Sequence, residues 1–440
     1  MAHPSAPLTP TIQRWISTLA ADLEKRQSDH LFRSLLPVNC AQGPELRIGS
    51  KKYLQFCTNN YLGLAADPEV IDVAHQALDR WGMGAGASRL VAGSMESHHE
   101  LEKDLAEFKR TEAALVLSSG YAANMAVLTT LVSPHDLILS DKLNHASLLD
   151  AAIASGGMCR TYPHRNYSRL SALLERKSKI FGESALSGKI PPAVIPPAQP
   201  EADISPGQQQ AWIITDTVFS MDGDLADLPQ LAQLSREYQA LIITDEAHAT
   251  GVLGPDGRGL AALQNVEASV AVSVGTLSKA LGSVGGFVTG PRAVIDTLIN
   301  RSRQFIYTTG LPAVCTAAAR CALHISRREP QRRRRVLALA THVRAELAQL
   351  GYQTGNSESP IIPVMLGTAQ HALRAAAWLR EKGIYIPAIR PPTVAPNTAR
   401  LRISLMSTHT DGQIDQLIAA MRELRDVLPR NDADEHFKRE

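Results

Sequence analysis

Cysteine is scarce in this chain, and the few cysteines are not arranged for cross-linking or metal binding. There are five of them among 440 residues, and none belongs to a Cys-x-x-Cys pair. An odd number without such pairs argues against a disulfide framework or a zinc site and is typical of a protein from a reducing cytosol. We therefore expect no metal centre.

Long apolar runs and an excess of charge of one sign are also missing. No stretch approaches the roughly 18 uninterrupted apolar residues of a membrane-spanning helix. Residues 1–10 lack the basic start and apolar core of a secretion signal, so a cytoplasmic protein is expected. The 45 basic and 43 acidic residues leave a net charge of +2, which gives no reason to expect a nucleic-acid or membrane partner.

The chain does contain the alternation of elements that is typical of a layered α/β protein. Short runs that are apolar on both faces, at 113–117, 212–215, 241–243, 270–274 and 286–288, alternate with helical periods. Such runs predict a mostly parallel sheet with helices on both faces. The expected fold class is therefore α/β.

The order of elements predicts three regions. Residues 1–55 are expected to form an N-terminal arm with a helix over 12–33, and residues 56–330 a large α/β domain. The pattern then changes to that of a smaller α+β domain over 331–440. The stretch 182–207 is rich in Pro, Ser, Gly and Gln and has no period, which predicts a surface insertion.

Two of the apolar runs end in chemically capable side chains. The run 241–244 ends in Asp245-Glu246-Ala247-His248, and Lys279 follows a second run, among the small residues of 273–282. An amine that can form a Schiff base, together with a carboxylate and an imidazole at a strand end, is the set that pyridoxal 5′-phosphate (PLP) chemistry requires. The sequence therefore predicts a PLP site.

The remaining parts of PLP also have candidate partners. Its phosphate suits the predicted helix N-terminus at Ser119-Gly120-Tyr121-Ala122, where free N–H groups and the helix dipole favour an anion, and Thr276 adds a hydroxyl. Asp245 can keep the pyridine nitrogen protonated through a charge-assisted hydrogen bond worth roughly 1.5–3 kcal/mol. His248 can reach the ring oxygen O3′. His145 can stack on the ring, although a lone histidine is more often structural.

Two other motifs lack the context that their usual functions need. Residues 245–248 spell the acidic box of one helicase class, but no Gly-x-x-x-x-Gly-Lys-[Ser/Thr] phosphate loop accompanies it. Residues 82–86 are rich in glycine, but no strand directly precedes them and the third glycine of a dinucleotide fingerprint is absent. ATP hydrolysis and dinucleotide binding are therefore not expected.

With these residues identified, the chain resembles the α-oxoamine synthases, which are PLP-dependent enzymes of fold type I. The resemblance covers about residues 31–428, with the stretch at 182–207 as its main gap. The motifs that carry it occur in the family's order: Asn59-Asn60-Tyr61-Leu62-Gly63-Leu64, Gly84-Ala85-Gly86-Ala87-Ser88-Arg89, Asn144-His145-Ala146-Ser147, Val218-Phe219-Ser220-Met221-Asp222-Gly223-Asp224, Asp245-Glu246-Ala247-His248-Ala249-Thr250-Gly251, Gly275-Thr276-Leu277-Ser278-Lys279-Ala280, Tyr307-Thr308-Thr309 and Arg390-Pro391-Pro392-Thr393-Val394.

The resemblance implies a role for each matching residue. Lys279 would bind PLP covalently and later move the substrate α-proton, Asp245 would pair with the pyridinium, and His145 would stack on the ring. The residues that would seat the cofactor are Gly120, Tyr121, His145, Ser220, Asp245, His248, Thr276, Lys279, Thr308 and Thr309. Those that would contact the substrates are Arg33, Asn59, His145, Thr393 and Arg402. The family builds its site at a homodimer interface, where Thr308 and Thr309 would reach the neighbouring subunit's cofactor.

The implied reaction is a decarboxylative condensation of an amino acid with an acyl thioester. Residues 390–393 are most similar to the branch that joins L-alanine to a pimeloyl group, carried by coenzyme A or a carrier protein, in biotin biosynthesis. Departures from the family pattern at Asn60, Gly310, Ala313 and 394–397 leave other branches open. These are the glycine C-acetyltransferases, the 5-aminolevulinate synthases and the long-chain acyl synthases.

A scaffold that binds PLP without turnover is a further alternative. The complete set of Lys279, Asp245, His248 and His145 argues against it, because a non-catalytic relative has no chemical need for all four.

Arginines form the strongest local charge cluster, at 332–335. The cluster begins a predicted helix and contains no aromatic residue, which favours a solvated helix face. The alternative is an electrostatic attractor for a phosphorylated acyl carrier.

Overall fold

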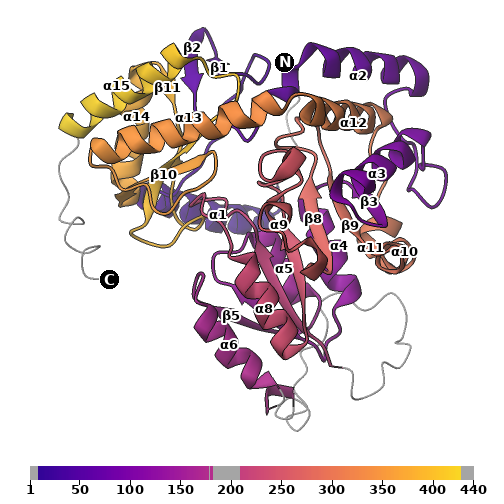
Figure 1. Cartoon of the computed structure of the whole chain (residues 1–440). Helices are drawn as coiled ribbons and strands as arrows, with labels where there is room; N and C mark the ends of the chain where they lie inside the picture. Colours follow the sequence, from indigo (N-terminus) through magenta and orange to yellow (C-terminus); the bar gives the residue numbers. More distant parts are fainter. Residues whose placement is uncertain (1–7, 178, 182–208, 428–440) are drawn as a thin grey trace.

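The computed structural model describes residues 8–177, 179–181 and 209–427 (Figure 1). The insertion predicted at 182–207 lies outside the described residues. A seven-stranded sheet, in the order β3-β9-β8-β7-β6-β4-β5, occupies the centre. Its strands are β3 (Ala113–Leu117), β4 (Leu137–Asp141), β5 (Met158–Tyr162), β6 (Ala211–Asp216), β7 (Ala240–Asp245), β8 (Val272–Thr276) and β9 (Gly286–Gly290).

The sheet is mostly parallel, which confirms the predicted fold class. Strands β5, β4, β6, β7 and β8 are parallel neighbours, whereas β9 runs antiparallel to both β8 and β3. Strand β3 therefore has the same direction as the parallel strands. The carboxyl ends of all strands except β9 consequently meet at one edge of the sheet, where open α/β sheets bind their ligands.

Both faces of the sheet are covered, and alternate side chains of each strand enter different cores. Ile213 and Ile242 pack into the core under α3, α6, α8 and α12, while Ile214 and Ile243 pack into the core under α4, α5 and α10. This double burial explains why the strands are apolar without alternation. The helices are α3 (Glu96–Lys109), α4 (Gly120–Leu131), α5 (Ala146–Ala154), α6 (Tyr167–Glu175), α8 (Leu228–Tyr238), α10 (Arg292–Arg301) and α12 (Ala313–Arg328).

A third core lies in the C-terminal part, beside the central sheet (Figure 1). It is built from α13 (Pro330–Gln349), α14 (Ala369–Glu381), α15 (Asp411–Val427) and the sheet β10-β13-β12, whose strands are Ile361–Gly367, Ala399–Ser404 and Ala388–Ile389. From the predicted arm, β1 (Glu45–Ile48) and β2 (Lys51–Gln55) form a sheet with β11 (Ile384–Tyr385). The domain boundaries at 55 and 330 stay predictions.

Several elements differ from the predicted ones. The first helix, α1 (Pro10–Ser28), ends before the predicted residue 33, because His30 has a φ of 59° and the amide of Leu31 turns back to the carbonyl of Arg26 at 2.8 Å. Strands β4 and β5 were not predicted; β5 lies at the sheet edge and half of it is polar or exposed. Helices α2 (Pro68–Trp81), α3, α5, α10 and α12 were also missed.

The arginine cluster is not a solvated helix face, so that prediction was wrong. Arg332 lies 2.8 Å from Asp67, Arg335 lies 2.5 Å from Asp411, and Arg333 is buried. These contacts join α13 to the rest of the chain. Within the described part of the chain, no helix is both long and apolar enough to cross a membrane.

Candidate active site

Acidic side chains gather at the carboxyl edge of the central sheet. Asp141, Asp216 and Asp245 end β4, β6 and β7, and Asp216 and Asp245 are direct partners in the register of their strands. All three are buried. Burial and the neighbouring charge of Asp245 raise the pKa of Asp216 well above its ordinary value. This edge therefore attracts cationic groups, such as an amine or a protonated ring nitrogen.

Lys279 follows β8 at this edge. Its amine makes no hydrogen bond or ion pair with any residue that the structure describes. Burial lowers the pKa of Lys279, although the carboxylates of Asp245 and Asp216 oppose this shift. An amine with a lowered pKa is more often neutral at physiological pH, which is the form that attacks a carbonyl.

Asp245 is held in place by two hydrogen bonds. Its Oδ2 accepts from the Asn124 amide at 2.6 Å, and its Oδ1 accepts from the backbone N–H of Ala247 at 2.9 Å. The Asn124 amide nitrogen also donates to the Ser147 hydroxyl, at 2.8 Å. The Asp245 carboxylate is thereby fixed at the strand end while it keeps lone pairs for a ligand.

His145 begins α5 and is linked to the same network. Its backbone N–H donates to Asp216 Oδ2 at 2.5 Å. Its Nδ1 lies 2.7 Å from the Ser147 hydroxyl and accepts from the Ser147 backbone N–H at 3.2 Å. Desolvation lowers the pKa of His145, although the residue as a whole is exposed. The neutral ring therefore carries its proton on Nε2.

His248 is the buried histidine of the site. Its Nδ1 lies 2.7 Å from the Tyr61 hydroxyl. Burial lowers the pKa of His248 well below its ordinary value and raises that of Tyr61. Both groups are therefore neutral, and the Tyr61 hydroxyl also donates to Asn59 Oδ1 at 3.2 Å.

The turn between β3 and α4 is the predicted position of the phosphate. Ser119 caps α4 by accepting from the backbone N–H of Ala122 at 3.0 Å. An added Cβ on Gly286 would lie 2.4 Å from the Ser119 carbonyl oxygen, whereas one on Gly120 would make only an ordinary contact with Thr276. Gly286 therefore lets β9 approach the turn. Tyr121 points elsewhere, because its hydroxyl donates to Asp150 at 2.8 Å.

The predicted amino-acid contacts come together around Arg402 on β13. Its guanidinium donates to Asn59 Oδ1 at 3.1 Å and to the Ser220 carbonyl at 2.5 Å. Arg402 is buried, and no carboxylate pairs with it among the described residues. A buried cation without an anionic partner suits a substrate carboxylate.

The predicted acyl contacts form a separate group. Arg33 donates to the Pro391 carbonyl at 3.1 Å and lies 3.4 Å from the Thr393 hydroxyl. Arg390 lies beside it, and burial together with the charge of Arg33 lowers the pKa of Arg390. The segment after α1 and the stretch before β13 therefore meet, although they are about 360 residues apart in the sequence.

Thr308 and Thr309 lie between α11 (Arg303–Ile306) and α12. They line a cavity of about 20 Å³ together with Ser118, which precedes the α4 turn. Thr309 also pairs with Ser88 through an isolated β-bridge. The structure thus places both threonines near Ser118, just before the turn between β3 and α4.

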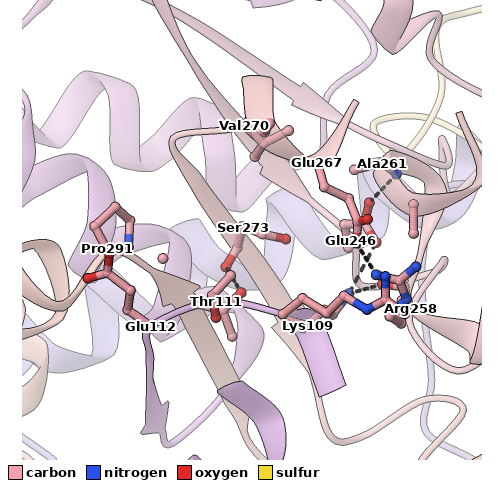
Figure 2. A pocket seen from close by; sticks show the side chains of 15 residues that line it. Lys109, Thr111, Glu112, Glu246, Arg258, Ala261, Glu267, Val270, Ser273 and Pro291 are labelled. Atoms are coloured by element: carbon pink, nitrogen blue, oxygen red, sulfur yellow. Dashed lines mark hydrogen bonds and ion pairs between the residues drawn. The ribbon is translucent and has the colours of Figure 1, made fainter. Parts of the chain in front are cut away.

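Glu246, the second acidic residue of the helicase-like motif, faces away from this site. Its Oε2 lies 3.2 Å from Lys109 Nζ, which also donates to the Thr250 hydroxyl at 3.0 Å. Both charged groups are buried beside a separate cavity of about 400 Å³ (Figure 2). Asp245 lies at the carboxyl edge of the sheet, while Glu246 ties the same segment to α3.

Five contributors to the site were missed by the sequence analysis: Asn124, Ser147, Asp216, Tyr61 and Gly286. Of these five, only Asn124 could have been noticed in the sequence, because it is a polar residue one turn into an apolar helix. The structure shows that it is buried. Asp216, Tyr61 and Gly286 gain their roles from partners that are distant in the sequence, and Ser147 from its neighbour His145 and from the distant Asn124.

The residues present fit PLP. The unpartnered Lys279 amine can bind its aldehyde carbon, and the buried Asp245 carboxylate can hold a protonated ring nitrogen. The exposed face of His145 suits an aromatic ring, and the α4 N-terminus suits a phosphate.

Replacing Lys109 should strongly destabilise the fold. We expect Lys109→Met to lower the free energy of unfolding by about 3–5 kcal/mol, because Glu246 would remain as an unpaired buried charge. Denaturant unfolding followed by circular dichroism measures this. As the control, Lys382→Met breaks an exposed pair with Glu423 and should change stability little. Equal effects of the two substitutions would contradict the importance of the buried pair.

Comparisons with known proteins agree with this site. The model of the family "Aminotransferase class I and II" matches residues 51–421. An 8-amino-7-oxononanoate synthase of Hahella chejuensis is 42% identical over 408 residues, which cover 92% of this chain and 96% of that protein. One of Geobacter sulfurreducens is 41% identical over 409 residues, which cover 92% of this chain and 97% of that protein.

Solved structures of related enzymes are also similar to this chain. A serine palmitoyltransferase of S. paucimobilis with PLP and myriocin bound has a TM-score of 0.83 at 26% identity, covering 94% of this chain and 99% of that one. An 8-amino-7-oxononanoate synthase of Francisella tularensis has a TM-score of 0.69 at 28% identity, covering 85% and 98%. The predicted resemblance is confirmed: the chain belongs to the aminotransferase class I and II family and, within it, to the α-oxoamine synthases.

Proposed function

We propose that this chain, with PLP as its cofactor, condenses L-alanine with a pimeloyl thioester to give 8-amino-7-oxononanoate, CO2 and the free thiol, in biotin biosynthesis. One observation carries the proposal: an unpartnered Lys279 amine of lowered pKa shares a site with the fixed, buried Asp245. The relatives that are about 42% identical over most of the chain bear the name of this activity.

PLP supplies an electron sink for the bond that breaks at the amino-acid α-carbon. Lys279 would hold it covalently, Asp245 would keep its ring nitrogen protonated, and His248 would donate from Nε2 to O3′. Gly120, Thr276 and the backbone of Tyr121 would seat the phosphate, because the Tyr121 hydroxyl is already used by Asp150. Ser220, Thr308 and Thr309 complete the proposed set.

The chain's own residues then handle the amino acid. Arg402 and Asn59 would bind its carboxylate, since Arg402 is a buried cation whose hydrogen bonds in the described structure go to uncharged oxygens. This contact would orient the α-carbon toward Lys279. The released Lys279 amine, which is more often neutral because of its lowered pKa, would accept the α-proton at Nζ.

His145 would act on the thioester. The two hydrogen bonds that its Nδ1 receives from Ser147 place the proton on Nε2, so the ring can donate to the thioester carbonyl oxygen. A neutral imidazole also suits a position beside the cofactor ring that Asp245 would keep protonated, because two neighbouring cations repel each other.

Arg33 and Thr393 would contact the pimeloyl group, carried by coenzyme A or by a carrier protein. A long-chain acyl synthase is the second candidate, because the serine palmitoyltransferase fold covers 94% of this chain with a TM-score of 0.83.

A homodimer with shared sites is part of the proposal. Helix α1 buries none of its residues in the described chain, and its apolar side chains Ile12, Trp15, Ile16 and Leu19 follow one helical face. An exposed apolar face of this kind is typical of a surface covered by a partner. Thr308 and Thr309 would then reach the partner's cofactor.

A substrate panel tests the reaction. PLP-loaded protein is mixed with L-alanine and pimeloyl-CoA, with L-serine and palmitoyl-CoA, or with glycine and acetyl-CoA or succinyl-CoA, while CO2 and free thiol are measured. We expect rapid turnover only with L-alanine and pimeloyl-CoA. Turnover only with another pair would assign another branch of the family and overturn the biotin assignment.

Lys279→Ala should abolish turnover by at least about a thousandfold, the scale of a lost acid–base group, and should leave the fold intact. Steady-state rates and circular dichroism measure the two effects. Lys142→Ala is the matched control, since Lys142 is an exposed lysine at the same sheet edge and should keep full activity. Full activity in Lys279→Ala would refute the mechanism.

In a plot of kcat against pH, the midpoint of the activity loss at acid pH should lie below the ordinary histidine pKa of about 6.5. The reason is that desolvation lowers the pKa of His145 and keeps its ring neutral. Activity is thus present above this lowered pKa and is lost as the pH falls through it. In Ser147→Ala, one hydroxyl donor to Nδ1 is lost, so the pKa of His145 should rise and the midpoint should move to higher pH. If Ser147→Ala loses activity at the same acid pH as wild type, this role of Ser147 is excluded.

A further inference from the structure

The loop 218–225 joins the central sheet to the C-terminal sheet. It follows β6 and is closed by a bridge between Val218 and Leu225. The C-terminal part of the chain contacts the tip of this loop. The backbone N–H groups of Glu358 and Ser359 donate to the Gly223 carbonyl at 3.0 and 3.1 Å. An added Cβ on Gly223 would lie 2.1 Å from the Ile361 carbonyl oxygen, so the loop and β10 are in close contact.

The same loop holds two arginines of β13. Arg402 donates to the Ser220 carbonyl at 2.5 Å, and Arg400 pairs with Asp222. The position of the loop therefore sets the orientation of the Arg402 guanidinium, which also contacts Asn59.

His164 anchors the base of this loop from the turn between β5 and α6. Its Nδ1 lies 3.0 Å from Asp141 Oδ1, and its Nε2 lies 2.7 Å from Asp224 Oδ2. Both carboxylates are buried. The ring also meets Phe219 edge-on, with the ring centroids 4.4 Å apart. An imidazole donates to two carboxylates only when both of its nitrogens carry protons, so this geometry is that of an imidazolium.

The charges around His164 favour that state. Asp141 faces it from the end of β4 and Asp224 from the loop, while the Arg165 guanidinium lies 3.6 Å from Asp224. Burial acts to lower the pKa of His164, but the hydrogen bonds and charges of the two carboxylates outweigh it and raise the pKa to about 9. The ion pairs are thus present at neutral pH and are lost as the pH rises through about 9.

We propose that His164 is a positioning residue: as an imidazolium between Asp141 and Asp224, it fixes the 218–225 loop and thereby aims Arg402 at the amino-acid carboxylate. This inference rests on the proposed role of Arg402. His164 lies outside the site, but its charge would control the affinity for the amino acid. That affinity would therefore fall at alkaline pH.

The test compares wild type with His164→Gln and with His135→Gln, which changes an exposed histidine at the opposite end of β4. L-alanine is titrated into the PLP-loaded proteins while the cofactor absorption band is followed, and KM is measured for alanine and for the thioester. At neutral pH we expect a roughly tenfold weaker affinity for alanine in His164→Gln, from the loss of charge-assisted hydrogen bonds. The KM for the thioester should not change, and His135→Gln should match wild type.

The pH dependence separates positioning from a general loss of structure. The affinity ratio between wild type and His164→Gln should fall toward one as the pH rises through the pKa of His164. The amine of alanine also titrates, but equally in all the proteins, so it cancels in the ratio. A ratio that is independent of pH, or an equal rise of both KM values, would overturn the proposal.

A second variant keeps the proposal testable if His164→Gln does not fold. Asp224→Asn removes one of the two carboxylates, so the alkaline loss of alanine affinity should move to lower pH. If Asp224→Asn loses its affinity for alanine at the same pH as wild type, the proposal is contradicted. If wild type does not turn over L-alanine, the proposed function fails, and the same titrations with the amino acid that it does accept still test His164.

Discussion

A buried carboxylate that cannot move is the constraint on which this site depends. Asp245 ends a strand in the middle of the sheet, with Asn124 and the backbone of Ala247 holding its two oxygens. A carboxylate in this position is costly unless a cation or a donor meets it. The lowered pKa of Lys279, the neutral state of His145 and the raised pKa of Asp216 all arise at the same buried edge.

The architecture explains how groups from distant segments reach one place. Parallel strands bring Asp141, Asp216 and Asp245 to one edge, and helices cover both faces of the sheet. The C-terminal part supplies Arg402 across the loop 218–225, and His164 holds the other side of that loop. The proposed cofactor site and the proposed amino-acid contact are thus joined through one short segment.

Residue patterns predicted much of this arrangement, but not all of it. Lys279, Asp245 and His248 could be found because each follows an apolar run, and the same runs predicted the parallel sheet. Asn124 and Ser147 could not be assigned, because their roles depend on helices α4 and α5 meeting over β7. The edge strand β5 was missed because its polar residues break the apolar pattern. The arginines at 332–335 were misjudged, since their partners Asp67 and Asp411 are far away in the sequence. The assigned roles of the site residues stay predictions.

The attachment of the cofactor tests the central claim most directly. PLP-loaded protein is reduced with borohydride, which makes a Schiff base permanent, and is then digested and examined by peptide mass spectrometry. We expect a single pyridoxyl group on the peptide that contains Lys279. A pyridoxyl group on another lysine, or none at all, would contradict covalent binding of PLP by Lys279.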